Sequence, residues 1–431
     1  MHRGRFLIVF ICIGLLPLVL PPAFSLTLSL DDALERGIEN SLDLKRSLID
    51  LSVAEYSANR LWSELFPAIS ASLGASYASS LFSGDGFELS RDGAGFSAGL
   101  GLSLTLNAGI PFAIRNIRLA YQSRLLSYED ARNQLGIQLT KNFFGLIADG
   151  DNLAVLADML RLAELQHQRN QVAFNNGLVG ELTLMQSRLG MENARYSLSA
   201  ARSAYATRMA DFLAQLGIAQ DTETVLEGKI EISRVEADAE RLIREYLPRR
   251  PDIVSRRQEI ERLENAQRQT AYASRAPSLR LQAEWNSRSF DPFADSLSGS
   301  ATLNIPIDPW VSGSRAGQSI RGARATVERA RLDLQSAEEA AALQIRSLAA
   351  NLRNSWDSIE IARLSLSVAE RGYELTEQGF RNGTVESLRL EDARNNLVSA
   401  RQRLLQSELS YLTMILDVSA ALNISWKDLM Q

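Results

Sequence analysis

The chain has 431 residues, of which 45% are hydrophobic, and its 46 basic and 51 acidic side chains give a net charge of −5. This mild acidity excludes a nucleic-acid-binding protein, which needs a basic surface. Its cysteine and histidines are Cys12, His2 and His167, so thiol- or imidazole-based metal sites and nucleophiles lack parts. We expect that the protein binds no metal or cofactor and is not an enzyme. An enzyme whose active site uses carboxylates alone remains possible on composition.

Residues 1–25 have the features of a secretory signal peptide. A positively charged start precedes an apolar run from Phe6 to Leu20, and small residues lead to Ser25. The run is interrupted by Pro17 and is short for a membrane anchor, which needs about 20 residues. We predict cleavage after Ser25. The mature chain then has no cysteine, because Cys12 leaves with the leader, and gains nothing from disulfides.

The remaining chain reads as one unit written twice, over 26–217 and 237–431, with a polar linker over 218–236 that is expected to have little regular structure. Phe174-Asn175-Asn176-Gly177 returns as Phe380-Arg381-Asn382-Gly383, a shift of 206 positions. Each unit is predicted to contain a helix, a proline, two strands, a second proline, a very long helix, an Asn-Gly turn and a last helix.

The first helix of each unit is predicted over about 30–66 and about 237–276, and each ends at a proline. The long helices are predicted over about 113–174 and about 315–380, with no proline inside. At 1.5 Å per residue, each reaches about 90 Å. That length suits a structure that crosses a compartment better than a globular core.

Between these helices, apolar and polar residues alternate strictly in four segments. The apolar positions are Ile69, Ala71, Leu73, Ala75 and Tyr77; Phe96, Ala98, Leu100, Leu102, Leu104 and Leu106; Leu279, Leu281, Ala283 and Trp285; and Leu297, Ala301, Leu303, Ile305 and Ile307. Alternation over about 9 to 11 residues predicts strands with one apolar face, at the length that crosses a bilayer. Loops are expected over 79–95 and 286–296. No stretch after the leader approaches 18 apolar residues, so membrane insertion would use these strands.

Four strands cannot close a barrel, because an open sheet in lipid leaves backbone groups unpaired. Closed barrels have about eight strands or more, so two or three chains must share one. The polar faces carry Ser, Gly, Thr, Asn and Gln, which line water well and favour the larger number. Aromatic residues near the strand ends suit a membrane-interface girdle or plain core packing equally: Phe66, Tyr77, Trp285 and Trp310.

The last helix of each unit carries an apolar stripe with a period of seven. Its members are Leu184, Met191, Leu198 and Tyr205 in the first unit and Leu390, Leu397, Leu404 and Tyr411 in the second. This period predicts a left-handed coiled coil. A helical hairpin in a soluble bundle would carry the same stripe, but the strands argue against that interpretation.

Taken together, the chain resembles the TolC-like outer-membrane efflux proteins (outer membrane factors), the exit ducts of tripartite pumps and type I secretion systems. The resemblance is carried by the duplicated element order, the proline-bounded strands, the Phe-x-Asn-Gly turns and the run Gly-Thr-Val-Glu-Ser-Leu-Arg-Leu-Glu-Asp-Ala over 383–393. It implies a mainly α protein in which each chain gives four transmembrane strands to a 12-stranded barrel of a homotrimer. It also implies a long α-helical barrel in the periplasm, an adaptor protein and an inner-membrane pump as partners, and outer-membrane lipid around the strands.

The resemblance also assigns two candidate sites. Members of the family form acidic rings at their periplasmic constriction from two positions after the second glycine turn; Asp392 matches one, and Arg389 occupies the other. We expect Arg389 and Asp392 to form the closed gate, with solvated surface charges as the equal alternative. The turns at Asn176-Gly177 and Asn382-Gly383 are the expected docking points for the adaptor, although a plain turn between helices explains them as well.

Two other classes stay open, a passive outer-membrane porin or adhesin, and a periplasmic coiled-coil scaffold or enzyme. A soluble monomer would fit only the latter class. The sequence does not name the exported cargo.

Overall fold

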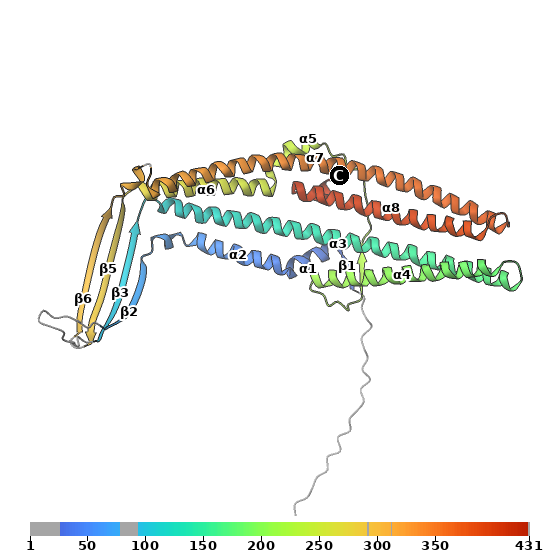
Figure 1. Cartoon of the computed structure of the whole chain (residues 1–431), viewed down its shortest axis with the longest axis horizontal. Helices are drawn as coiled ribbons and strands as arrows, with labels where there is room; N and C mark the ends of the chain where they lie inside the picture. The colour runs from blue at the N-terminus through green and yellow to red at the C-terminus, as the bar shows by residue number, and fades with distance from the viewer. Residues whose placement is uncertain (1–25, 78–93, 291–292, 312, 430–431) are drawn as a thin grey trace, which may run out of the picture.

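The computed structural model describes residues 26–77, 94–290, 293–311 and 313–429. The predicted signal peptide and nearly all of the loop predicted over 79–95 lie outside these residues. Figure 1 shows an elongated molecule with a four-stranded sheet at one end and the turns of two long helical hairpins at the other. The predicted order of long helices and strand pairs is therefore present.

The first unit contains these elements in order: β1 (Leu26–Ser29), α1 (Leu30–Asn40), α2 (Leu42–Asn59), the 3₁₀ helix η1 (Leu61–Leu65), β2 (Ala68–Tyr77), β3 (Ala94–Leu106), α3 (Ile110–Asn175) and α4 (Glu181–Gln215). The rest contains β4 (Thr224–Glu227), α5 (Ala239–Tyr246), η2 (Leu247–Arg249), α6 (Pro251–Arg275), β5 (Ser278–Phe290), β6 (Phe293–Asn304), η3 (Asp308–Trp310), α7 (Arg315–Arg381), α8 (Ser387–Leu422) and α9 (Trp426–Leu429).

The long helices match their prediction, and the first helix of each unit does not. α3 and α7 are unbroken over 66 and 67 residues. The helix predicted over 30–66 breaks at Ser41, whose hydroxyl accepts a hydrogen bond from the backbone N–H of Leu44 at 3.2 Å and so caps a new helix. The helix predicted over 237–276 breaks at Arg250, because the residue before Pro251 is held in an extended conformation.

The sheet is antiparallel in the order β2-β3-β5-β6. Its register pairs Ile69 with Leu102, Leu100 with Trp285, and Leu281 with Ala301. Paired residues in a sheet lie on the same face, so the apolar sets of all four strands share one face. This common face agrees with the predicted alternation.

Two details of the strand prediction are wrong. The loop predicted over 286–296 is largely strand, because β5 continues to Phe290 and β6 begins at Phe293. At the other end, β6 stops at Asn304, so Ile305 and Ile307 lie beyond it. Pro306 has no N–H for a ladder, which explains why the strand does not run on.

The segment over 218–236 has little regular structure, as predicted, apart from β4, which pairs in parallel with β1. It then crosses the protein to the second unit, where the buried Tyr411 hydroxyl donates to the Ser233 carbonyl at 3.0 Å and accepts from the Val235 N–H at 2.9 Å. We call β1, α1, β4, the chain over 218–238, α5 and α9 the belt. Figure 1 shows it at mid-length, where α2 meets α4 and α6 meets α8 nearly end to end.

Each level of the molecule has the same lateral order. Between the belt and the sheet, α3 and α6 pack side by side, with α2 and α7 as the outer helices. Between the belt and the tip, where the two helical hairpins turn, α3 and α8 are central, with α4 and α7 outside. Leu198, Leu390, Leu397 and Tyr411 of the seven-residue stripes are buried, as a coiled coil requires, and the other stripe members are partly buried. In the described parts of the chain, no helix combines enough length and apolar character to span a membrane.

Candidate functional site

The apolar face of the sheet is uncovered. Leu73 is 91% exposed and Leu297 is 80% exposed, on strands at opposite edges. The other face carries small polar residues packed closely: a Cβ atom on Gly99 would lie 2.7 Å from Asn286 Oδ1 and 2.8 Å from Ser72 Oγ. Exposed apolar area costs about 25 cal/mol per Å² in water. The sheet is thus built for an apolar medium on one side and for water on the other.

The sheet has two open edges, β2 and β6. Such edges present a row of N–H and C=O groups to any chain that can pair with them. They lie on the same two sides as the outer helices, α2 and α4 on the first side and α7 on the second. The protomer therefore has two open sides, each made of an edge strand and of outer helices.

Between the belt and the tip, both of these open sides carry an exposed apolar stripe, which we call a seam. The seam on α4 consists of Leu182, Met185, Leu189 and Tyr196, and the seam on α7 consists of Ile361, Leu364, Val368 and Leu375; each side chain is more than half exposed. Both follow the three-and-four spacing of coiled-coil core positions. Within the described parts of the chain, no helix covers either seam.

The two predicted Asn-Gly turns lie at the tip, and they have one geometry. Gly177 and Gly383 have φ of 72° and 74°. The Leu178 N–H donates to the Ala173 carbonyl at 2.8 Å, and the Thr384 N–H donates to the Gly379 carbonyl at 2.9 Å. These are Schellman caps, in which glycine takes the left-handed position. Asn176 and Asn382 end their helices and are exposed, so both turns are open to a partner.

Arg389 and Asp392 lie exposed near the start of α8, a turn apart. The structure does not bring them together: across the described residues, neither side chain forms an ion pair or a hydrogen bond. The same helix buries Leu390 and Arg394 against the other hairpin. The two predicted gate residues thus occupy the face of α8 that is free in the single protomer.

A buried polar cluster that the sequence did not reveal joins the two hairpins near the tip. Arg394 is 6% exposed and has an ion pair with Glu391 of 3.6 Å. The buried Ser187 lines the same small cavity as Arg394, and its Oγ lies 3.1 Å from His167 Nδ1. Gln166 lines this cavity as well, and its Nε2 donates to Oδ1 of the buried Asn170 at 3.1 Å. Among the described residues, Arg394 Nε and Asn170 Nδ2 have no hydrogen-bond partner. The only sequence signal was that Arg394 falls between stripe residues, one turn after Leu390.

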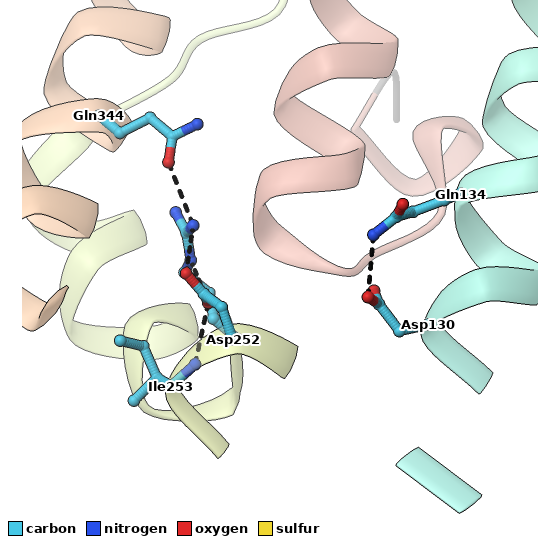
Figure 2. Close-up of polar contacts among 6 residues, drawn as sticks. Asp130, Gln134, Asp252, Ile253 and Gln344 are labelled. Atoms are coloured by element: carbon cyan, nitrogen blue, oxygen red, sulfur yellow. Dashed lines mark hydrogen bonds and ion pairs between the residues drawn. The ribbon is translucent and has the colours of Figure 1, made fainter. Parts of the chain in front are cut away.

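A second buried arginine fixes the start of α6 at the belt. Arg250 is 8% exposed; its Nε and Nη2 donate to the Asp252 carboxylate at 3.0 and 2.9 Å, and Nη2 also donates to Gln344 on α7 at 3.1 Å. Figure 2 shows this chain of contacts beside the Gln134–Asp130 pair of α3. A cavity of about 280 Å³ lies between α3, α6 and α8 here. We assign these contacts a structural role, since they hold α6 to α7.

Comparison with known proteins identifies relatives over most of the chain. The profile of the family described as "Outer membrane efflux protein" matches residues 33–217 and 242–423. The toluene efflux pump outer membrane protein TtgC of Pseudomonas putida is 25% identical over 422 residues, which cover 92% of this chain and 84% of TtgC. The antibiotic efflux pump outer membrane protein ArpC of Pseudomonas putida has the same identity and coverage.

Solved structures share the fold. The Campylobacter jejuni CmeC outer membrane channel superposes with a TM-score of 0.73 at 20% identity and covers 91% of this chain and 85% of its own. The open state of the Neisseria gonorrhoeae MtrE outer membrane channel gives a TM-score of 0.72 at 15% identity, with coverage of 92% and 89%.

Proposed function

The chain belongs to the outer membrane efflux protein family, and we propose that it forms, as a homotrimer, the exit duct of a tripartite efflux pump or type I secretion system. It is an outer-membrane channel whose helices extend into the periplasm, and it conducts its cargo passively. The observation that carries the proposal is the two-faced sheet with open edges, set on helices far longer than a simple pore needs. The repeated units over 26–217 and 237–431 would each supply half of a protomer's wall.

Ring closure supports the trimer. Three protomers bring 12 strands, in which β2 of one copy pairs with β6 of the next and no edge remains in lipid. The same rotation sets the α4 seam of one copy against the α7 seam of its neighbour. Leu189 lies eight residues from the tip end of α4, and Leu375 lies six residues from the tip end of α7. They are therefore about 12 and 9 Å from the tip and would meet at nearly the same height.

The partners and sites follow from that arrangement. An adaptor protein from the inner-membrane pump would dock at the turns formed by Asn176, Gly177, Asn382 and Gly383, which are exposed at the far end from the sheet. Arg389 and Asp392, which have no ion pair among the described residues, would face their copies around the axis and form a mixed-charge gate. Rings of charged side chains control ion passage in narrow pores.

Cysteine cross-linking of the purified trimer tests this function. The cysteine-free mature chain gives a clean background for the pair Leu189→Cys and Leu375→Cys. Oxidation is expected to produce covalent dimers and trimers, whereas either single variant should stay monomeric on denaturing gels. The trimer should also conduct ions in a planar bilayer. A monomer in detergent that neither cross-links nor conducts would overturn the proposal.

A further inference from the structure

We propose that the belt makes its own contact between neighbouring protomers, in which the acidic helix α1 of one copy enters an arginine-lined groove on α7 of the next. This inference rests on the ring proposed above. It adds an electrostatic contact at mid-length, far from both the sheet and the tip seams. The occupant is therefore a second copy of this chain.

The groove has a volume of about 960 Å³ and lies between the chain over 234–241 and the face of α7 over 346–356. Four arginines line it: Arg234, Arg241, Arg346 and Arg353. Ala349 and Ala350 line it between Arg346 and Arg353 and leave room for a partner's backbone to approach. Arg234 and Arg353 are exposed.

Three acidic residues line the groove, Glu236, Asp238 and Glu240, and the last two have partners within the protomer. Asp238 caps α5, because its carboxylate accepts the N–H groups of Glu240 and Arg241 at 3.0 and 3.4 Å. Glu240 accepts from Arg346 at 2.8 Å, and this hydrogen bond lowers the pKa of Glu240. Over the described residues, Arg234 and Arg353 take part in no ion pair. With two such arginines against the single carboxylate of Glu236, the groove keeps a surplus of positive charge and fits an anionic partner.

Helix α1 presents the complementary charge. It buries Ala33 and Gly37 against the protein core, so its acidic residues face outward: Asp31, Asp32, Glu35 and Glu39. The Asp32 carboxylate is held by Ser29 in a capping box, and Asp31 lies 3.9 Å from Lys427. Glu35 and Glu39 lie one turn apart on one face and have no ion pair within the described chain. These two carboxylates are the free negative charges of α1, and the exposed Arg36 lies between them on the same helix.

Helix α1 and the arginine-lined groove lie at the same level along the long axis of the protomer, on opposite sides of it. α1 packs on α3 beside Leu139, on the side of α2 and α4. The 206-residue shift between the units carries Leu139 to Ile345, the neighbour of Arg346 in the groove on α7. Ring closure brings these two sides together. On α7 the exposed Leu343 and Ile361 lie just before and just after the groove, so the groove continues the apolar seam.

A cross-link at the belt tests the inference separately from the ring. We would combine Arg353→Cys with Glu35→Cys or with Glu39→Cys in the full-length mature chain and treat the trimer with a short bismaleimide. Covalent dimers and trimers are expected for at least one pair, and none for the single variants. If Leu189→Cys with Leu375→Cys cross-links while neither belt pair does, the belt contact is wrong and the ring stands. If no pair cross-links, both proposals fail.

Charge reversal gives the second readout. Arg353→Glu is expected to lower the temperature at which the trimer dissociates in mild detergent, and Arg353→Glu with Glu39→Arg is expected to recover it. Recovery supports an α1 occupant. A loss that Glu39→Arg leaves unchanged would indicate that a soluble anion, not α1, occupies the groove and would overturn the inference. Unchanged dissociation in the Arg353→Glu single variant would overturn it as well.

Discussion

Gly190 of α4 lies so close to Glu391 of α8 that a Cβ atom at position 190 would overlap the Glu391 carboxylate. This contact is where the two hairpins meet near the tip. Glu391 is also the ion-pair partner of the buried Arg394. A single methyl group can therefore reach the polar cluster that joins the hairpins.

Replacing Gly190 by alanine should destabilise the protein, although alanine normally favours a helix by about 1 kcal/mol. The new methyl group displaces Glu391 from Arg394 and leaves the guanidinium without its counter-charge. The matched control is Gly372→Ala on α7, where nothing lies within 4 Å of the added Cβ. We expect the free energy of unfolding to be about 1 to 3 kcal/mol lower for Gly190→Ala than for Gly372→Ala in chemical denaturation. Equal values would mean that the hairpins do not depend on this contact.

The ion pair itself gives a second prediction. Glu391→Gln removes the charge that compensates the buried Arg394, so it should cost about 1 to 3 kcal/mol of unfolding free energy. Adding Arg394→Met should recover most of that loss, because no buried charge then remains. Glu192→Gln is the control, since Glu192 pairs with Arg195 at the same spacing on an exposed surface, where such pairs contribute about 0.3 to 0.5 kcal/mol. A double variant less stable than Glu391→Gln would contradict this account.

The proposed gate predicts a change in conduction. Arg389→Ala leaves the three Asp392 carboxylates uncompensated around the axis, so cation selectivity and block by multivalent cations should increase. Asp392→Ala should reverse that preference. Single-channel recording measures both effects, with Glu374→Ala as the control because Glu374 pairs with Arg371 on its own helix. Unchanged conductance and block in both variants would identify the two residues as solvated surface charges.

At the tip, Gly383→Ala should weaken the turn and Gly383→Asn should not. Alanine pays about 1 kcal/mol or more for a left-handed conformation that asparagine tolerates. No atom lies within 4 Å of the added Cβ, so the cost is in the backbone alone. Efflux by a cell that carries the pump and adaptor, measured as resistance to its cargo, should fall for Gly383→Ala and remain for Gly383→Asn. Full resistance with a bulky residue at position 383 would count against adaptor docking there.

The pH dependence of stability should contain a component from Asp149. Burial raises the pKa of the Asp149 carboxyl group, and the hydrogen bond from Arg208 at 2.6 Å opposes this only in part. A raised folded-state pKa means that the protonated group stabilises the fold below its ordinary value of 3.8 and that this contribution is lost as the pH rises through the raised pKa. Asp149→Asn should therefore be more stable than the parent at pH 7, and the difference should vanish near pH 3. Urea denaturation at both values measures it; a constant difference would be the contrary result.

The sequence predicted the elements whose signal is local and repeated. Proline-free runs gave the extent of α3 and α7 to within a few residues, and the alternation around Leu100 and Leu303 gave the two-faced sheet. It failed at 286–296, where Asn286 and Ser296 look like loop residues but pair across β5 and β6. Strand pairing outlasts the apolar alternation there, so periodicity alone could not find it.

The belt could not be predicted from the sequence because its elements are short and their contact partners lie far apart along the chain. β1 has four residues and pairs with β4 about 200 residues later. The buried position of Arg394 was hidden for a different reason, since an arginine on a coiled-coil helix normally lies at the surface. The candidate turns at Gly177 and Gly383 were found because positive φ has a clear residue preference.

The unequal continuity of the helices has a mechanical consequence. At mid-length, two of the four helices in the protomer wall are interrupted, between α2 and α4 and between α6 and α8, whereas α3 and α7 run through without a break. A helical bundle in which half of the helices are interrupted at one level is least stiff there, so we expect elastic deformation of the protein to concentrate at mid-length. The segment over 218–238 crosses this level, is held by the two hydrogen bonds of the Tyr411 hydroxyl, and reinforces it. We expect the sheet end and the tip end of the protein to bend relative to each other at this cross-section.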